Sequence, residues 1–223
     1  MPSFTEENYL KAVYKLAEAA PGSDVSTNSI AEVLQTRPAS VTDMLRRLSE
    51  KGLLHYQRYR GVSLTPEGRQ LALLTIRKHR LWEVFLVQKL GFNWDEVHEV
   101  AEQMEHIDSP LLVRRLDEFL GFPRLDPHGD PIPTEDGAML RPTHRLVADL
   151  QPGEQGPVVA VKNTSVTFLQ YLDKAGLKLG SYIEVLDKVA FDNSLEVRIN
   201  KQATTMLSAE VSRNLFVAGQ AAS

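Results

Sequence analysis

Apolar positions in the first part of the chain recur at helical spacing in three successive segments. Over residues 5–20 this spacing predicts a helix with Thr5 as its N-cap. A short helix over about 27–34 and a second helix from Pro38 to Gly52 follow, because proline suits the first position of a helix and glycine its end. Two short helices with such a tight connection are typical of a helix-turn-helix.

The pattern changes over residues 53–65, where aromatic and branched side chains flank a turn near Arg60 and Gly61. This arrangement predicts a β-hairpin. Thr65 and Pro66 then begin a long helix that extends to about residue 90. A helix-turn-helix followed by a hairpin and a long helix has the order of a winged helix.

The rest of the chain changes from helical to β-like spacing. Helices are expected over 93–108 and 109–120, and the stretch 122–152, rich in Pro, Gly and Asp, is interpreted as a connector. One helix-like insert over 165–175 interrupts a series of short β-like runs. These runs are Val158–Val161, Tyr182–Leu186, Leu195–Ile199 and Leu215–Val217. We therefore expect an α+β protein whose last part is a small β-barrel.

Composition excludes several classes of protein. The chain has 223 residues, of which 43% are hydrophobic and 24% charged, as in ordinary globular proteins. No stretch approaches the ~18 consecutive apolar residues of a membrane span, and the start lacks a signal-peptide pattern, so we expect no membrane and a cytoplasmic location. The absence of cysteine excludes a disulfide scaffold, a catalytic thiol and a thiolate metal site.

The distribution of charge matters more than the net charge of −4. Residues 1–80 contain 12 Lys and Arg against 8 Asp and Glu, whereas residues 81–223 contain 13 against 21. Within 35–80 the excess sharpens to 10 basic against 3 acidic residues. A basic block on an otherwise acidic chain indicates a surface that binds a polyanion.

The second helix of a helix-turn-helix enters the major groove, where its first residues meet base edges. Here Ser40, Thr42 and Asp43 suit hydrogen bonds with bases or phosphates, and Ala39 suits contact with a thymine methyl group. The other predicted DNA-binding residues are Arg37, Pro38, Arg46 and Arg47 of this helix and Arg58, Tyr59 and Arg60 of the hairpin. Each arginine alone is explained as well or better by a solvated surface. DNA binding is favoured by the order of the elements: a helix, a turn, a second helix that begins with proline, and a basic hairpin.

Histidines and carboxylates share helix faces in two places. His79 and Glu83 are four positions apart on the long predicted helix, so they lie on one face. The next helix carries four such residues at i, i+4, i+7 and i+8: His98, Glu102, Glu105 and His106. Residues 95–108 contain six carboxylates and no Lys or Arg, and a bound cation would relieve their repulsion. Nitrogen and carboxylate donors favour Mn²⁺ or Fe²⁺; the alternative is a surface ion pair and a solvated acidic helix.

An enzyme would need a different pattern. His98 and Glu99 begin like the zinc-protease motif, but Glu102 stands where the second His is required. No Walker loop, Gly-rich nucleotide fingerprint or serine-hydrolase elbow is present. We expect the protein not to be an enzyme, and keep a metal-dependent hydrolase as the rival from another class.

At Pro38–Thr42, Tyr59–Thr65, Arg77–Leu81 and Glu105–His106 the chain resembles the metal-dependent repressors of the diphtheria toxin repressor and manganese transport regulator type. The resemblance implies three domains. These are a winged helix-turn-helix DNA-binding domain over 1–74, a helical dimerisation and metal-binding domain with connector over 75–150, and an SH3-like, FeoA-like β-barrel over 151–223.

The same resemblance implies two metal sites. His79, Glu83 and His98 match an ancillary site, whereas Glu102, Glu105 and His106, with Asn8, match a primary site. Glu102 stands where the iron branch has Cys and the manganese branch has Glu, which favours Mn²⁺ first and Fe²⁺ second. Asn8 replaces the family's Met or Asp, Lys11 stands where the manganese branch has a further carboxylate, and residues 163–167 lack the Glu and Gln of the iron branch.

These observations together predict a metal-activated, homodimeric transcriptional regulator. It would bind a near-palindromic double-stranded DNA operator, because the symmetry of a dimer demands one. We expect it to repress metal-uptake genes. The leading alternative is a winged-helix regulator that responds to a non-metal effector through its C-terminal domain.

Overall fold

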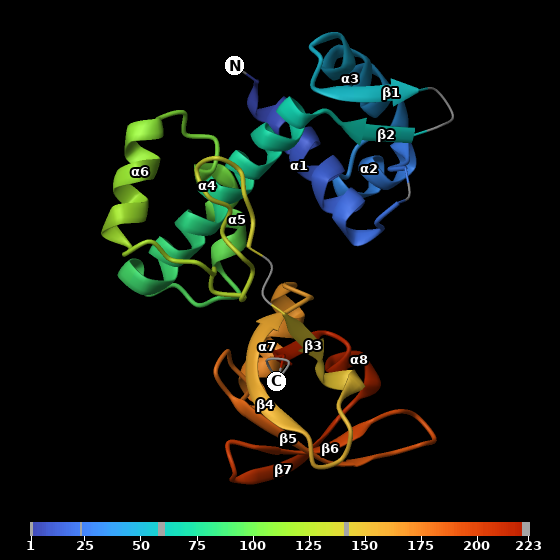
Figure 1. The fold of residues 1–223 in the computed structure, drawn as a ribbon, viewed down its shortest axis with the longest axis vertical. Helices are drawn as coiled ribbons and strands as arrows, with labels where there is room; N and C mark the ends of the chain where they lie inside the picture. The colour runs from blue at the N-terminus through green and yellow to red at the C-terminus, as the bar shows by residue number, and fades with distance from the viewer. Residues whose placement is uncertain (1, 23, 58–60, 141–142, 220–223) are drawn as a thin grey trace. The chain divides into compact units, whose positions relative to one another are not determined.

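The computed structural model describes residues 2–22, 24–57, 61–140 and 143–219 (Figure 1). The first helix, α1, spans Phe4–Ala19. The predicted N-cap Thr5 is wrong, because Ser3 caps α1 in a capping box with Glu6 and thereby satisfies the first backbone N–H groups. The predicted helix-turn-helix is present, with α2 at Thr27–Val33 and α3 at Pro38–Glu50.

A two-stranded hairpin, the wing, follows α3 directly. Strands β1 (Leu54–Gln57) and β2 (Gly61–Leu64) pair antiparallel, and β1 contacts α3. The predicted DNA contacts Arg58, Tyr59 and Arg60 lie outside the described residues. The long helix α4 spans Pro66–Leu90, as the sequence predicts, and the hydroxyl of Thr65 accepts the N–H of Gly68 in its first turn.

Two shorter helices follow: α5 at Val97–Met104 and α6 at Pro110–Phe119. The expected helix over 93–108 is longer than the observed α5 at both ends. At the start, the N–H of Asn93 bonds the carboxylate of Glu96 in a turn. At the end, Glu105 and His106 lie in a turn just after Met104. None of the described helices combines the length and hydropathy needed to cross a membrane.

The C-terminal part is a six-stranded sheet with the order β3-β8-β4-β5-β6-β7. Its members are β3 (His144–Leu146), β4 (Gln155–Val161), β5 (Tyr182–Lys188), β6 (Leu195–Ile199), β7 (Ala203–Leu207) and β8 (Leu215–Ala218). A 3₁₀ turn, η1 (Val147–Asp149), and helices α7 (Val166–Lys174) and α8 (Ala209–Ser212) accompany the strands. Because β3 and β7 are the edges of the described sheet, the predicted small β-barrel is present as a six-stranded sheet that does not close. The stretch interpreted as a connector also supplies β3.

The described chain divides into two units with separate cores. The first comprises Met1–His79, Glu102–Arg115 and Pro133–Met139; the second comprises Arg80–Ala101, Leu116–Ile132 and Leu140–Ser223. The core of the first unit contains apolar residues of α1, α2, α3, the hairpin and α4. The other core lies between the sheet, α7 and α8. Each unit therefore buries its own apolar residues.

Candidate metal centre and nucleic-acid interface

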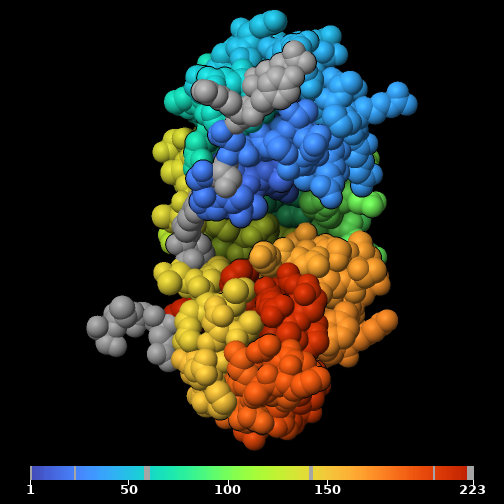
Figure 2. All heavy atoms as spheres, turned by 90° about the vertical axis from the view of Figure 1, so that its right-hand side faces the viewer, coloured from blue at the N-terminus to red at the C-terminus, as the bar shows by residue number. Residues whose placement is uncertain are grey.

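Helix α3 buries one face and exposes the other. Val41, Leu45 and Leu48 are fully buried in the first core. The exposed residues include those predicted to meet DNA: Arg37, Pro38, Ala39, Ser40, Asp43, Arg46 and Arg47. Thr42 is half-buried and donates its hydroxyl to the carbonyl of Pro38 at 3.1 Å. Figure 2 shows this part of the chain, in light blue, on the visible surface.

The predicted ancillary residues come together around α4. His79 and Glu83 are one turn apart on this helix, and both are buried. Oε1 of Glu83 lies 3.4 Å from Nδ1 of His98 on α5. The three side chains each offer a possible ligand atom, and these atoms lie within 4.8 Å of one another. Two imidazoles and a carboxylate suit Mn²⁺, Fe²⁺ or Zn²⁺, so these residues fit a divalent cation.

Glu83 has a further neighbour, His128, which the sequence pattern does not single out. Nε2 of His128 donates to the backbone carbonyl of Trp94 at 2.8 Å, so Nδ1 is the nitrogen that faces Oε2 of Glu83, at 3.8 Å. Burial lowers the pKa of His128, but the carboxylate of Glu83, together with the charge of Asp126 and the bond to Trp94, outweighs burial and raises this pKa to about 9. With no metal bound, this raised pKa favours a proton on His128 beside the Glu83 carboxylate.

Asp126 forms a second group of possible ligands with Glu83 and His128, again within 4.8 Å. Its Oδ1 accepts the backbone N–H groups of His128 and Asp130 at 2.8 and 3.0 Å, and Nε of Arg80 lies 3.4 Å from Oδ2. Burial, followed by the charges of Asp130 and Glu83, raises the pKa of Asp126 to about 7. Both oxygens of Asp126 already have partners. Asp126 is therefore better suited to holding the backbone of residues 126–130 in a turn than to binding a metal.

Glu105 lies just after α5 and is completely buried. Its Oε2 is 2.6 Å from Nδ1 of His79, and its Oε1 is 2.5 Å from Nζ of Lys11 on α1. Burial raises the pKa of the Glu105 carboxyl, but the hydrogen bond with His79 and the charge of Lys11 outweigh burial and leave this pKa below its ordinary value. Glu105 is thus an ionised carboxylate that joins His79 to Lys11.

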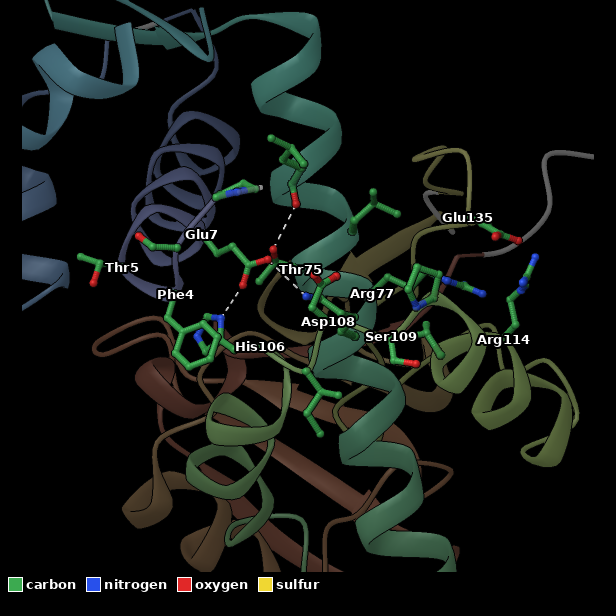
Figure 3. Close-up of a pocket in the computed structure, with 18 residues that line it drawn as sticks. Phe4, Thr5, Glu7, Thr75, Arg77, His106, Asp108, Ser109, Arg114 and Glu135 are labelled. Atoms are coloured by element: carbon green, nitrogen blue, oxygen red, sulfur yellow. Dashed lines mark hydrogen bonds and ion pairs between the residues drawn. The ribbon is translucent and has the colours of Figure 1, made fainter. Parts of the chain in front are cut away.

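His106 contacts the first turns of α1 (Figure 3). Its Nδ1 lies 2.5 Å from Oε2 of Glu7, and the ring of Phe4 stacks on the imidazole with centroids 4.8 Å apart. Oε1 of Glu7 accepts a hydrogen bond from Lys78 at 3.3 Å. These side chains line part of a pocket of about 800 Å³ within the first unit. The imidazole of His106 is therefore already engaged by a carboxylate of the first helix.

The predicted primary set consists of Asn8, Glu102, Glu105 and His106. Nζ of Lys11 lies 3.1 Å from Oε1 of Glu102 as well as 2.5 Å from Oε1 of Glu105. A cation bound to both oxygens at about 2.2 Å would lie within about 5 Å of this ammonium and be repelled by it. The buried Oδ1 of Asn8, which has no hydrogen-bond partner among the described residues, does favour a cation. With Lys11 between its carboxylates, the set does not fit a divalent metal.

Glu7, Asp126 and His128 were not among the predicted site residues. Glu7 and Lys11 are four positions apart on the first helix, so their shared face was a signal available in the sequence. Asp126 and His128 lie in a stretch without helical or strand periodicity, which is why the pattern assigned them to a connector.

Three family descriptions match successive parts of the chain. Residues 3–62 match "Iron dependent repressor, N-terminal DNA binding domain", and residues 65–134 match "Iron dependent repressor, metal binding and dimerisation domain". Residues 145–219 match the FeoA domain. Their order agrees with the order of winged helix, helical segment and sheet in the structure.

Among individual relatives, the iron-dependent repressor IdeR of Mycobacterium tuberculosis is 40% identical over 129 residues, which span 58% of this chain and 55% of that protein. The diphtheria toxin repressor of Corynebacterium efficiens is 32% identical over 194 residues, which span 82% of this chain and 84% of the relative. A solved structure described as a manganese-dependent transcriptional repressor in complex with manganese has a TM-score of 0.85 and 36% identity, and the match covers 96% of this chain and 99% of that one. The chain therefore belongs to the family of iron- and manganese-dependent transcriptional repressors.

Proposed function

We propose that this protein is a homodimeric, metal-activated DNA-binding regulator that represses metal-uptake genes in response to Mn²⁺ or, second, Fe²⁺. The observation that carries the proposal is the course of α4. This one helix begins directly after the hairpin, at Pro66, and carries His79 and Glu83 further along. A metal bound at these residues and His98 would therefore act on a helix that is continuous with the DNA-binding part of the chain.

The proposed mechanism is linkage. Metal shifts the protein toward the DNA-binding state only by the difference between its affinities for the two states. In a homodimer the two α3 helices would contact equivalent half-sites, which makes a near-palindromic operator the expected target. The family matches at 3–62, 65–134 and 145–219 support the proposed domains 1–74, 75–150 and 151–223.

The proposed function is tested by a gel shift of the purified protein on fragmented genomic DNA of its source. Mn²⁺, Fe²⁺ kept reduced, and a chelator are compared. We expect a few discrete fragments to shift only with metal, and their sequences to contain near-palindromic sites. Equal shifts with metal and chelator would contradict metal activation, and no discrete shift under any condition would contradict operator binding.

Replacing Arg47 by Ala is expected to weaken operator binding and to reduce the dependence of affinity on salt. Arg47 is exposed on α3, and an arginine that neutralises one phosphate contributes about one unit to the slope of log affinity against log salt. Titrations at several salt concentrations measure this slope. Arg213→Ala, which removes an exposed arginine after α8, is the matched control and should leave the slope unchanged. Equal slopes for Arg47→Ala and the unsubstituted protein would remove Arg47 from the interface.

A further inference from the structure

Lys11 is a buried cation between two carboxylates of the predicted primary metal set. Its side chain is only 8% exposed, and Nζ lies 3.1 Å from Oε1 of Glu102 and 2.5 Å from Oε1 of Glu105. Glu105 itself is completely buried. A buried carboxylate requires a partner of opposite charge, and here the ammonium of Lys11 is that partner.

The charges around Lys11 are close to balance without a metal ion. Three carboxylates, those of Glu7, Glu102 and Glu105, face two ammonium groups, those of Lys11 and Lys78. Lys11 is the partner of Glu102 and Glu105, and Glu7 bonds both Lys78 and the imidazole of His106. Each of these carboxylates therefore has a cationic or imidazole partner. A divalent ion added to this cluster would introduce an excess of positive charge unless the ammonium of Lys11 moved out.

Lys11 also ties the DNA-binding part of the chain to the end of α5. Its neighbour Leu10 is fully buried in the core that holds α2 and α3. Glu102 lies near the end of α5, and Glu105 follows that helix. The ion pairs therefore join α1 to this end of α5, 91 and 94 positions further along the chain.

We propose that Lys11 is a resident cation that takes the place of the metal at Asn8, Glu102, Glu105 and His106. The metal response then depends on His79, Glu83 and His98 alone, and the link between α1 and α5 is present at every metal concentration. This inference rests on the proposed function only where it assigns the metal response to His79, Glu83 and His98. It departs from what the resemblance implies, namely two metal sites in each chain.

The test counts the Mn²⁺ ions bound per chain, by isothermal titration calorimetry and by metal analysis after gel filtration. We expect Lys11→Met to bind one more Mn²⁺ per chain than the unsubstituted protein, because the carboxylates of Glu102 and Glu105 become available. His106→Ala should leave the count unchanged when Lys11 is present and should lower it by one in the Lys11→Met background. A count lowered by His106→Ala in the presence of Lys11 would overturn the proposal.

Two further variants keep the test decisive if Lys11→Met folds poorly. Lys11→Arg retains the positive charge and should keep the count of the unsubstituted protein. Lys15→Met removes an exposed lysine one turn further along α1 and is the matched control for loss of charge. An additional Mn²⁺ bound by Lys11→Arg or by Lys15→Met would overturn the proposal, because neither removes the cation from the carboxylates.

Operator binding separates failure of this inference from failure of the proposed function. In chelator, titration to protein concentrations well above those of the gel shift measures the weak basal affinity of the unsubstituted protein for the operator. Lys11→Met should bind about tenfold more weakly than this basal value, and Mn²⁺ should restore its affinity. Unchanged affinity of Lys11→Met in chelator would overturn the resident-cation role, whatever the metal response of the unsubstituted protein. If operator binding by the unsubstituted protein did not change with Mn²⁺ or Fe²⁺, metal activation would be refuted. The number of Mn²⁺ ions bound per chain would still test whether Lys11 occupies the metal position.

Discussion

Replacing Glu83 by Gln is expected to abolish the stimulation of operator binding by Mn²⁺. Glu83 is the residue common to both groups of possible ligands, and its side chain is 3% exposed. Glutamine has the same shape but removes the charge that attracts a divalent cation. Allosteric coupling between two binding sites is typically worth about 5–150-fold, so a loss of operator affinity within that range is expected at saturating Mn²⁺. Gel shifts across a Mn²⁺ titration measure it, with binding in chelator as the baseline.

Glu99→Gln is the matched control for this prediction. Glu99 is also a glutamate, lies on α5 next to His98, and is exposed. Its substitution should leave the Mn²⁺ titration unchanged. If Glu83→Gln retained the full stimulation, the metal would have to bind elsewhere, and the assignment to His79, Glu83 and His98 would be wrong.

Replacing Gly68 by Ala is expected to destabilise the first unit by about 3 kcal/mol or more. Gly68 lies in the first turn of α4, and a Cβ atom there would be 1.8 Å from the carbonyl oxygen of Leu53 and 2.8 Å from its carbon. Both are backbone atoms, so neither can rotate away. The same carbonyl accepts the N–H of Thr65, which means that moving it also disturbs the start of α4. Thermal unfolding followed by circular dichroism should show a transition lowered by about 10 °C.

Gly52→Ala separates a steric effect from a general effect of losing glycine. Gly52 has φ +71° and nothing within 4 Å of its added Cβ, so only the cost of left-handed backbone, about 1 kcal/mol, is expected. Similar losses for the two variants would contradict the close approach of α4 to Leu53.

Local chemistry explains which elements the sequence predicts well. Helices α3 and α4 begin at Pro38 and Pro66, and α4 has the predicted length because Thr65 caps it and its apolar positions recur without interruption. Strand β7 was missed because apolar and polar positions do not alternate strictly along Ala203–Leu207, and its pairing with β6 makes it a strand. The sequence predicted the small β domain but not that its sheet stays open, because closure depends on pairing between the first and last strands, which local periodicity does not encode.

The sequence by itself determined the winged helix, the exposed basic face of α3 and the helix faces that carry His79, Glu83 and His98, because each follows from spacing within one or two neighbouring elements. Only the tertiary structure decided how these residues are partnered. It places His128 against Glu83, 45 positions away, and Lys11 between Glu102 and Glu105, more than 90 positions away. The physical reason is that an ion pair depends on which side chains packing brings within a few ångströms, and chain folding over such separations leaves no periodic trace in the sequence.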